Sequence, residues 1–247
     1  MNNKKFSVCM SVYKNDDSTD FTDAVLSIYN QSCRPDEIIL VVDGPVPEIM
    51  HDTISALKKK TGIMKVIQLE RNMGHAIARQ TGLEAARNEL CAVMDADDIS
   101  VPERFEKQLK AFEEHPEVSV VGGLINEFIN KPENVVGTRI VPEHDAGIKE
   151  YLKSRCPMNL VTVMLKKSDV MKVGGYLDWY CEEDYYLWIR LTLGGYKFYN
   201  IQENLVNVRV GEEMYQRRGG MRYFKSEAKL QRYMLDNHLI NPGGGGI

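Results

Sequence analysis

Three aspartates fall within four consecutive positions, directly after an apolar run. They are Asp95, Asp97 and Asp98 in the segment "CAVMDADDIS". Carboxylates this close raise one another's pKa, so a cation is needed if all of them are to ionise. Oxygen ligands suit Mg²⁺, Mn²⁺ or Ca²⁺ better than zinc. The spacing therefore predicts a site for a hard divalent cation.

Two common sites can be tested against this segment. An EF-hand would place Asp95 and Asp97 at ligand positions, but Ser100 stands where that loop needs glycine, and Pro102 interrupts it. A dinucleotide-binding Rossmann start needs a glycine-rich turn after the first strand, and residues 1–35 contain no glycine. The remaining interpretation is Mg²⁺ or Mn²⁺ that completes its coordination shell with water and substrate phosphates.

The first hundred residues alternate between strand and helix patterns. Short apolar runs predict strands at 6–13, 37–42, 64–69 and 90–95, and helical spacing predicts helices between them. Strands that are apolar on both faces are typical of a parallel sheet covered by helices on two sides. The sequence therefore predicts an α/β fold.

Polar residues follow all four predicted strands. Tyr13 follows the first, Asp43 the second, the segment 71–74 the third, and the acidic cluster the fourth. Ligands of open α/β sheets bind beyond the carboxyl ends of the strands. Any one of these loops could be polar only because Asp, Asn and Gly favour turns. Their coincidence at four strand ends predicts a ligand site at one edge of the sheet.

The second half of the chain has a less regular pattern. We expect helices at 102–116 and 182–195, strands at 118–129, strands and a turn within 159–176, and a pair of strands at 197–210. A basic loop, a helix and a flexible glycine-rich end follow. The predicted organisation is one domain at 1–210, with a nucleotide-binding half at about 1–100 and an acceptor half at about 101–210, and then the segment 211–247.

Composition narrows the functional classes. The chain has 247 residues, is 43% hydrophobic and 27% charged, and has a net charge of −4, which is not typical of a nucleic-acid partner. Its five cysteines form no CxxC pair, which favours reduced core thiols and a cytoplasmic location. The sequence contains no apolar run long enough for a membrane span and no signal-peptide pattern at its beginning.

Five segments, in order, resemble a known family: "SVCMSVY", "LSIYNQSCRPDEIILVVDGP", "RNMGHAIARQTGL", "MDADD" and "EEDYYLWIRL". The sequence resembles family 2 glycosyltransferases with a GT-A fold, and most closely the amylovoran-type enzymes of bacterial exopolysaccharide and O-antigen assembly. The resemblance covers about residues 6–220. It implies a Rossmann-like, mostly parallel central sheet flanked by helices, a smaller acceptor-side subregion and a C-terminal helix.

The resemblance also implies a reaction. Members transfer a sugar from a nucleotide-diphosphate donor to an acceptor hydroxyl, usually with inversion and with Mn²⁺ or Mg²⁺. A UDP-sugar is the default donor, and bacterial surface polysaccharide is the expected product. The expected partners are this donor and a saccharide acceptor, including lipid-linked forms.

The family's catalytic motifs match three acids of the central cluster and two acids further on. Asp97 is the expected principal metal ligand of the DxD motif, with Asp95 near the ribose and metal. Asp98 either assists the metal or caps the next turn. Asp184 matches the catalytic base, with Glu183 beside it; alternatively, both acids only complement a helix dipole.

The nucleotide side is expected to use residues at the first three strand ends. Asp43 matches the aspartate that holds the base or ribose, and Tyr13 lines the base pocket. Asn72, Gly74 and Arg79 match the segment near the ribose and diphosphate. Arg79 could instead be an ordinary surface arginine of a helix.

The C-terminal segment is basic. Arg217 and Arg218, in "QRRGGMR", could close over the donor diphosphate, bind anionic lipid, or belong to a loop without a role. The helix beyond them interleaves basic and apolar residues, which fits either peripheral membrane contact at the inner face of the cell membrane or packing on the domain. Its basic residues are Arg222, Lys225, Lys229 and Arg232.

Two other functions remain open at this point. A nucleotidyltransferase that makes sugar nucleotides could use a similar sheet, although the expected glycine-rich phosphate loop is missing. A catalytically silent carbohydrate-binding protein of the same fold is the other alternative.

Overall fold

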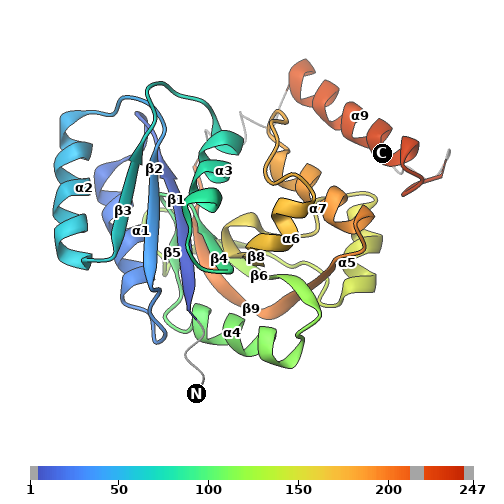
Figure 1. The fold of residues 1–247 in the computed structure, drawn as a ribbon, viewed down its shortest axis with the longest axis horizontal. Helices are drawn as coiled ribbons and strands as arrows, with labels where there is room; N and C mark the ends of the chain where they lie inside the picture. The colour runs from blue at the N-terminus through green and yellow to red at the C-terminus, as the bar shows by residue number, and fades with distance from the viewer. Residues whose placement is uncertain (1–4, 212–219, 242–247) are drawn as a thin grey trace.

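The computed structural model describes residues 5–211 and 220–241. Nine strands form one curled sheet in the order β3-β2-β1-β4-β8-β6-β9-β5, with β7 beside β6 (Figure 1). The strands are β1 (Phe6–Val12), β2 (Glu37–Val42), β3 (Met64–Gln68), β4 (Leu90–Met94), β5 (Ile99–Ser100), β6 (Val118–Phe128), β7 (Val135–Arg139), β8 (Met164–Lys166) and β9 (Lys197–Arg209). The helices are α1 (Ser18–Tyr29), α2 (Glu48–Thr61), α3 (His75–Ala85), α4 (Arg104–Glu114), α5 (Asp145–Leu152), η1 (Leu160–Thr162), α6 (Lys167–Lys172), α7 (Glu183–Leu193) and α9 (Met221–Asp236).

The first four strands form a parallel unit. β1 pairs with β2 on one side and β4 on the other, and β3 adds to β2, all in parallel register. All residues of β2 and β4 are buried. Parallel neighbours end at the same edge, so the loops after these strands meet there, as the sequence predicted.

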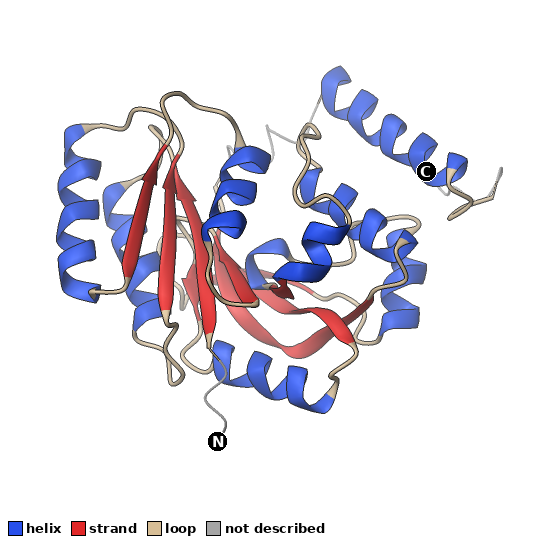
Figure 2. Ribbon diagram, in the orientation of Figure 1, coloured by secondary structure: helices blue, strands red, loops and turns tan. Residues whose placement is uncertain are grey.

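Helices cover both faces of this sheet (Figure 2). Phe6, Val8 and Met10 of β1 point into a core shared with α1, α2 and α4. Cys9 points to the opposite face, into a core shared with α3, α5, α7 and α9. The period-two alternation along β1 therefore supplies two cores.

The second half of the sheet is mixed. β8 runs antiparallel between β4 and β6, whereas β9 runs parallel to β6. The strand pair predicted at 197–210 is one continuous strand, β9, which follows the long edge of β6 through several register shifts. The turn predicted within 159–176 contains the helix α6. The continuous β9 follows from its pairing with the distant β6, which local patterns do not encode.

The cysteines are free, but they are not all core thiols. Cys9 and Cys91 are buried, whereas Cys181 is exposed and has a positive φ of 58°. The expectation of core thiols is therefore wrong for Cys181, which lies in the loop before α7.

Helix α9 packs on the domain through one face. Leu230 and Met234 are fully buried in the core next to α7. The Ser226 hydroxyl donates to the carbonyl of Tyr180 at 2.7 Å, and the Trp179 indole N–H donates to the carbonyl of Ser226 at 3.4 Å. Across residues 5–211 and 220–241, none of the helices has the length and apolar content to cross a bilayer.

Shortening Leu230 tests this packing. Leu230→Ala should lower the free energy of unfolding by about 3 kcal/mol, because it removes buried methyl groups and leaves a cavity. Urea denaturation measures the change. The matched control is Phe224→Ala on the same helix: Phe224 is 65% exposed, so stability should change by less than about 0.5 kcal/mol. Equal effects would mean that α9 does not dock as described.

Candidate active site

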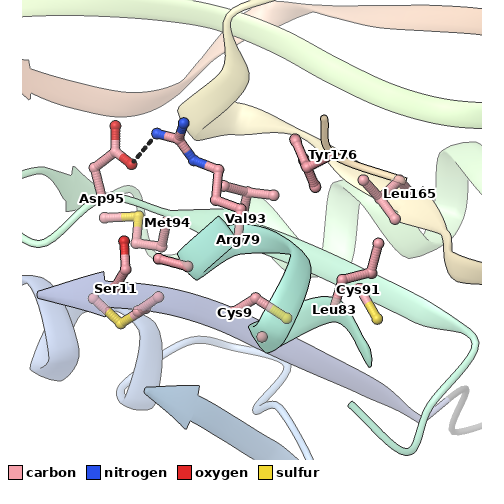
Figure 3. Close-up of a pocket in the computed structure, with 13 residues that line it drawn as sticks. Cys9, Ser11, Arg79, Leu83, Cys91, Val93, Met94, Asp95, Leu165 and Tyr176 are labelled. Carbon is pink, nitrogen blue, oxygen red and sulfur yellow. Dashed lines mark hydrogen bonds and ion pairs between the residues drawn. The ribbon is translucent and has the colours of Figure 1, made fainter. Parts of the chain in front are cut away.

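Arg79 joins two distant acids. It lies on α3; its guanidinium pairs with Glu183 at the start of α7 and, at 3.3 Å, with Asp95 after β4. Figure 3 shows the side chain reaching from α3 to Asp95. Burial opposes the charge, but the two carboxylates outweigh it and raise the pKa of Arg79. Arg79 is therefore not a surface arginine, and a contact with the donor diphosphate beside these two carboxylates stays a prediction.

Asp43 organises the turn that opens α3. Its carboxylate accepts from the backbone N–H groups of Met73 at 2.6 Å and Gly74 at 3.0 Å. Gly44 has φ +87°, and a Cβ there would lie 2.5 Å from the backbone nitrogen of Asn72. Glycine is thus required where the loops after β2 and β3 touch. A carboxylate has further lone pairs, so a nucleotide contact by Asp43 stays a prediction.

The other expected nucleotide residues lie beside Asp43. The side-chain amide of Asn72 donates to the Asp43 carbonyl at 3.5 Å. The Tyr13 ring stands edge-on to His75, with centroids 6.5 Å apart. The expected nucleotide residues therefore gather at the strand ends, as predicted: Tyr13, Asp43, Asn72 and Gly74. They do not line the cavity that Asp97 and Asp184 share.

A cavity of about 480 Å³ opens next to this group. The sequence-predicted acids at the end of β4 and at the start of α7 all line it, so Asp97 and Asp184 open onto one space. Its polar and charged lining residues are Arg79, Asp95, Asp97, Asp98, Arg139, Asn159, Cys181, Glu183, Asp184 and Arg209.

The three clustered aspartates differ in their surroundings. Asp98 is 3% exposed and accepts from the backbone N–H of Arg209 at 2.8 Å. Burial, and then Asp97, raise the pKa of Asp98 well above its ordinary value. The Asp97 side chain is exposed to the cavity; lost hydration, and then Asp95, raise its pKa to about 6. Asp98 therefore anchors the loop, and Asp97 faces the cavity.

Two arginines support the acidic loop, and sequence reasoning missed both. The Arg209 side chain donates to the carbonyl of Asp97 at 3.2 Å and pairs with Asp20 at 2.9 Å. Arg104 is fully buried and donates to the carbonyl of Val93 at 2.8 Å. Burial lowers the pKa of Arg104 to about 9. Their sequence contexts, a strand end and an amphipathic helix, gave no signal of this role.

The arrangement of the acidic side chains shows whether they could bind a divalent cation. Within residues 5–211 and 220–241, no three His, Cys, Asp or Glu side chains are arranged to hold an ion by themselves. Asp95 pairs with Arg79, and one oxygen of Asp98 accepts from the backbone N–H of Arg209, so a role for these two acids as metal ligands stays a prediction. The oxygens of Asp97 still fit Mg²⁺ or Mn²⁺ that takes its remaining ligands from water and substrate phosphates.

The first turn of α7 carries the other two acids. One oxygen of Asp184 accepts from the backbone N–H of Tyr185 at 2.8 Å, and the other lies 3.7 Å from the Cys156 sulfur. Burial, and then Glu183, raise the pKa of Asp184, while Arg79 opposes them. Asp184 also opens onto the shared cavity, and its role as the catalytic base stays a prediction. A raised pKa suits a general base.

Arg217 and Arg218 lie outside the described residues.

Comparison with known proteins decides the family. Residues 7–174 match the family described as Glycosyl transferase family 2.

The chain belongs to this family.

An uncharacterized glycosyltransferase of Haemophilus influenzae is 38% identical over 92% of this chain and 84% of its own length. The amylovoran biosynthesis glycosyltransferase AmsE of Erwinia amylovora is 34% identical over 93% of this chain and 85% of its own. The UDP-Gal:alpha-D-GlcNAc-diphosphoundecaprenol beta-1,3-galactosyltransferase of Escherichia coli is 36% identical over 96% of this chain and 86% of its own length.

Solved structures give the fold. The crystal structure of residues 1–349 of S. aureus TarS with UDP superposes with a TM-score of 0.65 at 20% identity, over 95% of this chain and 71% of that chain. The GT-A expectation is confirmed. This family 2 member is a glycosyltransferase, which removes the nucleotidyltransferase alternative.

Glu182, immediately before the acids of α7, gives a test by pH. It is 5% exposed, and burial, and then Glu227, raise its pKa from 4.5 to about 7. The folded state therefore binds this proton more tightly than the unfolded state, and stability falls as pH rises from 4.5 to about 7. Glu182→Gln should match wild type at pH 4 and exceed its free energy of unfolding by about 3 kcal/mol above pH 7.

Chemical denaturation at both pH values measures this difference. The matched control is Glu117→Gln, which removes an exposed carboxylate. A gain for Glu182→Gln that is the same at pH 4 and pH 8 would contradict the assignment.

Proposed function

We propose that this glycosyltransferase is metal-dependent and inverting, with a UDP-sugar as donor and a saccharide hydroxyl as acceptor in bacterial surface polysaccharide synthesis. The observation that carries the proposal is the single cavity lined by both Asp97 and Asp184. UDP is favoured because the E. coli relative is named for UDP-Gal and the S. aureus neighbour contains UDP.

The proposed division of labour follows from the acids. Asp184 takes the proton of the acceptor hydroxyl as its oxygen forms a bond to the anomeric carbon of the donor sugar. The bond from that carbon to the diphosphate breaks, and UDP leaves with the electron pair. Asp97 would hold Mg²⁺ or Mn²⁺, which supplies positive charge to the leaving phosphates when bound. Arg79 keeps Glu183 and Asp95 in place on either side.

Separate substitutions test the two roles. Asp97→Ala and Asp184→Asn should each reduce transfer from a UDP-sugar by at least about 100-fold. Asp97→Ala should also lose Mn²⁺-dependent binding of UDP, whereas Asp184→Asn should keep it, because the base does not hold the donor. Calorimetric titration with UDP and MnCl₂ separates them.

Asp52→Asn on α2 is the control, since Asp52 is exposed and does not line the cavity. Normal turnover by either site variant would refute the assignment. If GDP or dTDP with Mn²⁺ stabilised the protein and UDP did not, only the nucleotide would need correction.

We further propose peripheral contact of α9 with the inner face of the cell membrane. Leu230 and Tyr233 pack on the domain, so they are not available to lipid as the sequence pattern had suggested. Met221 and Phe224 are 68% and 65% exposed. The exposed Lys225 lies between Arg222 and Lys229 along the helix. Apolar side chains flanked by cations suit an anionic bilayer surface. This placement would bring the enzyme to a lipid-linked acceptor.

Vesicle sedimentation tests this contact. Replacing Phe224 and Lys225 by Ser and Gln should weaken binding to phosphatidylglycerol vesicles about fivefold, since a surface cation alone contributes about 1 kcal/mol. Ile49→Ser is the control, because Ile49 is 65% exposed on the distant α2. Equal binding to neutral phosphatidylcholine vesicles, or no effect of the double substitution, would contradict the contact.

A further inference from the structure

Three arginines line the cavity, and two of them already have carboxylate partners. Arg79 pairs with Asp95 and Glu183, and Arg209 pairs with Asp20. Arg139 differs: within the described part of the chain, no carboxylate lies in ion-pair range of its guanidinium. Its hydrogen-bond acceptor is a backbone oxygen, the carbonyl of Cys156, at 2.8 Å. Arginine has five N–H donors, so a partly buried arginine with one acceptor has donors left for an anion in the cavity.

Arg139 stands next to Asp184. It is the last residue of β7, and Cys156 contacts both residues. The Cys156 carbonyl accepts from Arg139, and the Cys156 sulfur lies 3.7 Å from Asp184. A ligand held by Arg139 is therefore adjacent to the carboxylate that would take the acceptor proton.

Asn159 adds a second unmet polar group to this wall. It is 2% exposed, and its amide nitrogen donates to the carbonyls of Gly123 at 2.8 Å and Arg139 at 3.4 Å. Its side-chain oxygen is buried and has no partner among the described residues. Leaving such an oxygen unpaired costs about 1–3 kcal/mol, which a ligand hydroxyl or a water could recover.

The two groups complement one chemical class. Arginine offers paired donors that match phosphate oxygens, and the asparagine oxygen accepts from a sugar hydroxyl. Glu183 and the acidic loop line the same cavity, and the other two lining arginines, Arg79 and Arg209, are already paired with carboxylates. A phosphate would be repelled by these acids unless a cation outside the ion pairs, such as Arg139, received it.

We propose that Arg139 binds a phosphate group of the acceptor, so that the substrate beside Asp184 is a phosphate- or diphosphate-linked saccharide. This inference rests on the proposed transfer function of the cavity. It adds an acceptor subsite that is separate from the donor diphosphate near Asp97.

Binding of decyl diphosphate tests the subsite. The protein is first saturated with UDP and MnCl₂, so that the donor position is filled, and is then titrated calorimetrically. Arg139→Gln should weaken decyl diphosphate binding at least about tenfold, because charge-assisted bonds are lost. Arg139→Lys should fall between wild type and Arg139→Gln. Arg155→Gln is the matched control, since Arg155 is exposed and does not line the cavity.

Further arms separate the sources of the anion. Inorganic pyrophosphate should depend on Arg139 in the same way as decyl diphosphate, whereas uncharged decyl glucoside should not depend on it. With a UDP-sugar and an alkyl-diphosphate-linked GlcNAc acceptor, Arg139→Gln should raise the acceptor KM and leave the donor KM unchanged. A merely structural role would change both KM values or the melting temperature.

Two results would overturn the subsite: unchanged affinity of Arg139→Gln for decyl diphosphate, or loss of decyl diphosphate binding by wild type once UDP is saturating. Failure of the proposed function is distinguishable, because UDP would then not bind in a manner that depends on Mn²⁺ and Asp97.

Discussion

The site depends on one buried arginine and its two carboxylates. Arg79 joins Asp95, after the fourth parallel strand, to Glu183 at the start of α7, which lies 104 residues after Arg79 in the chain. Removing one partner of the buried Arg79–Glu183 pair is expected to cost about 3–5 kcal/mol, because a charge is left without compensation. The interaction therefore fixes the acid-bearing turn of α7 against the acidic loop. Through it, a parallel sheet edge and a later helix enclose one cavity.

The remaining acids of that cavity are incompletely neutralised. Asp98 is buried against the backbone of β9, and Asp97 faces the cavity with a pKa raised to about 6 by lost hydration and by Asp95. Arg209 and Arg104 support the loop mainly through its backbone carbonyls and those of β4. The protein thus holds negative charge that a divalent cation with a diphosphate can satisfy.

The sequence predicted the parts governed by local periodicity. β1 to β4 are short buried runs separated by amphipathic helices, and their parallel order follows from the connections. The group at the strand ends and the start of α7 followed from that order together with the family resemblance. The single long strand β9 and the contacts of Arg104 and Arg209 could not be predicted, because each depends on which distant segment lies alongside. Asp98 was left undecided for the same reason, since its partner is Arg209 in β9.

The central claim is that a metal-bound donor and the catalytic base share this cavity. Crystals grown with UDP and MnCl₂ test it through anomalous scattering at the manganese edge. The account predicts one manganese peak in contact with a carboxylate oxygen of Asp97 and the phosphates of UDP, in the cavity that Asp184 lines. UDP bound with manganese in a space from which Asp184 is walled off, or UDP bound there without manganese, would contradict it.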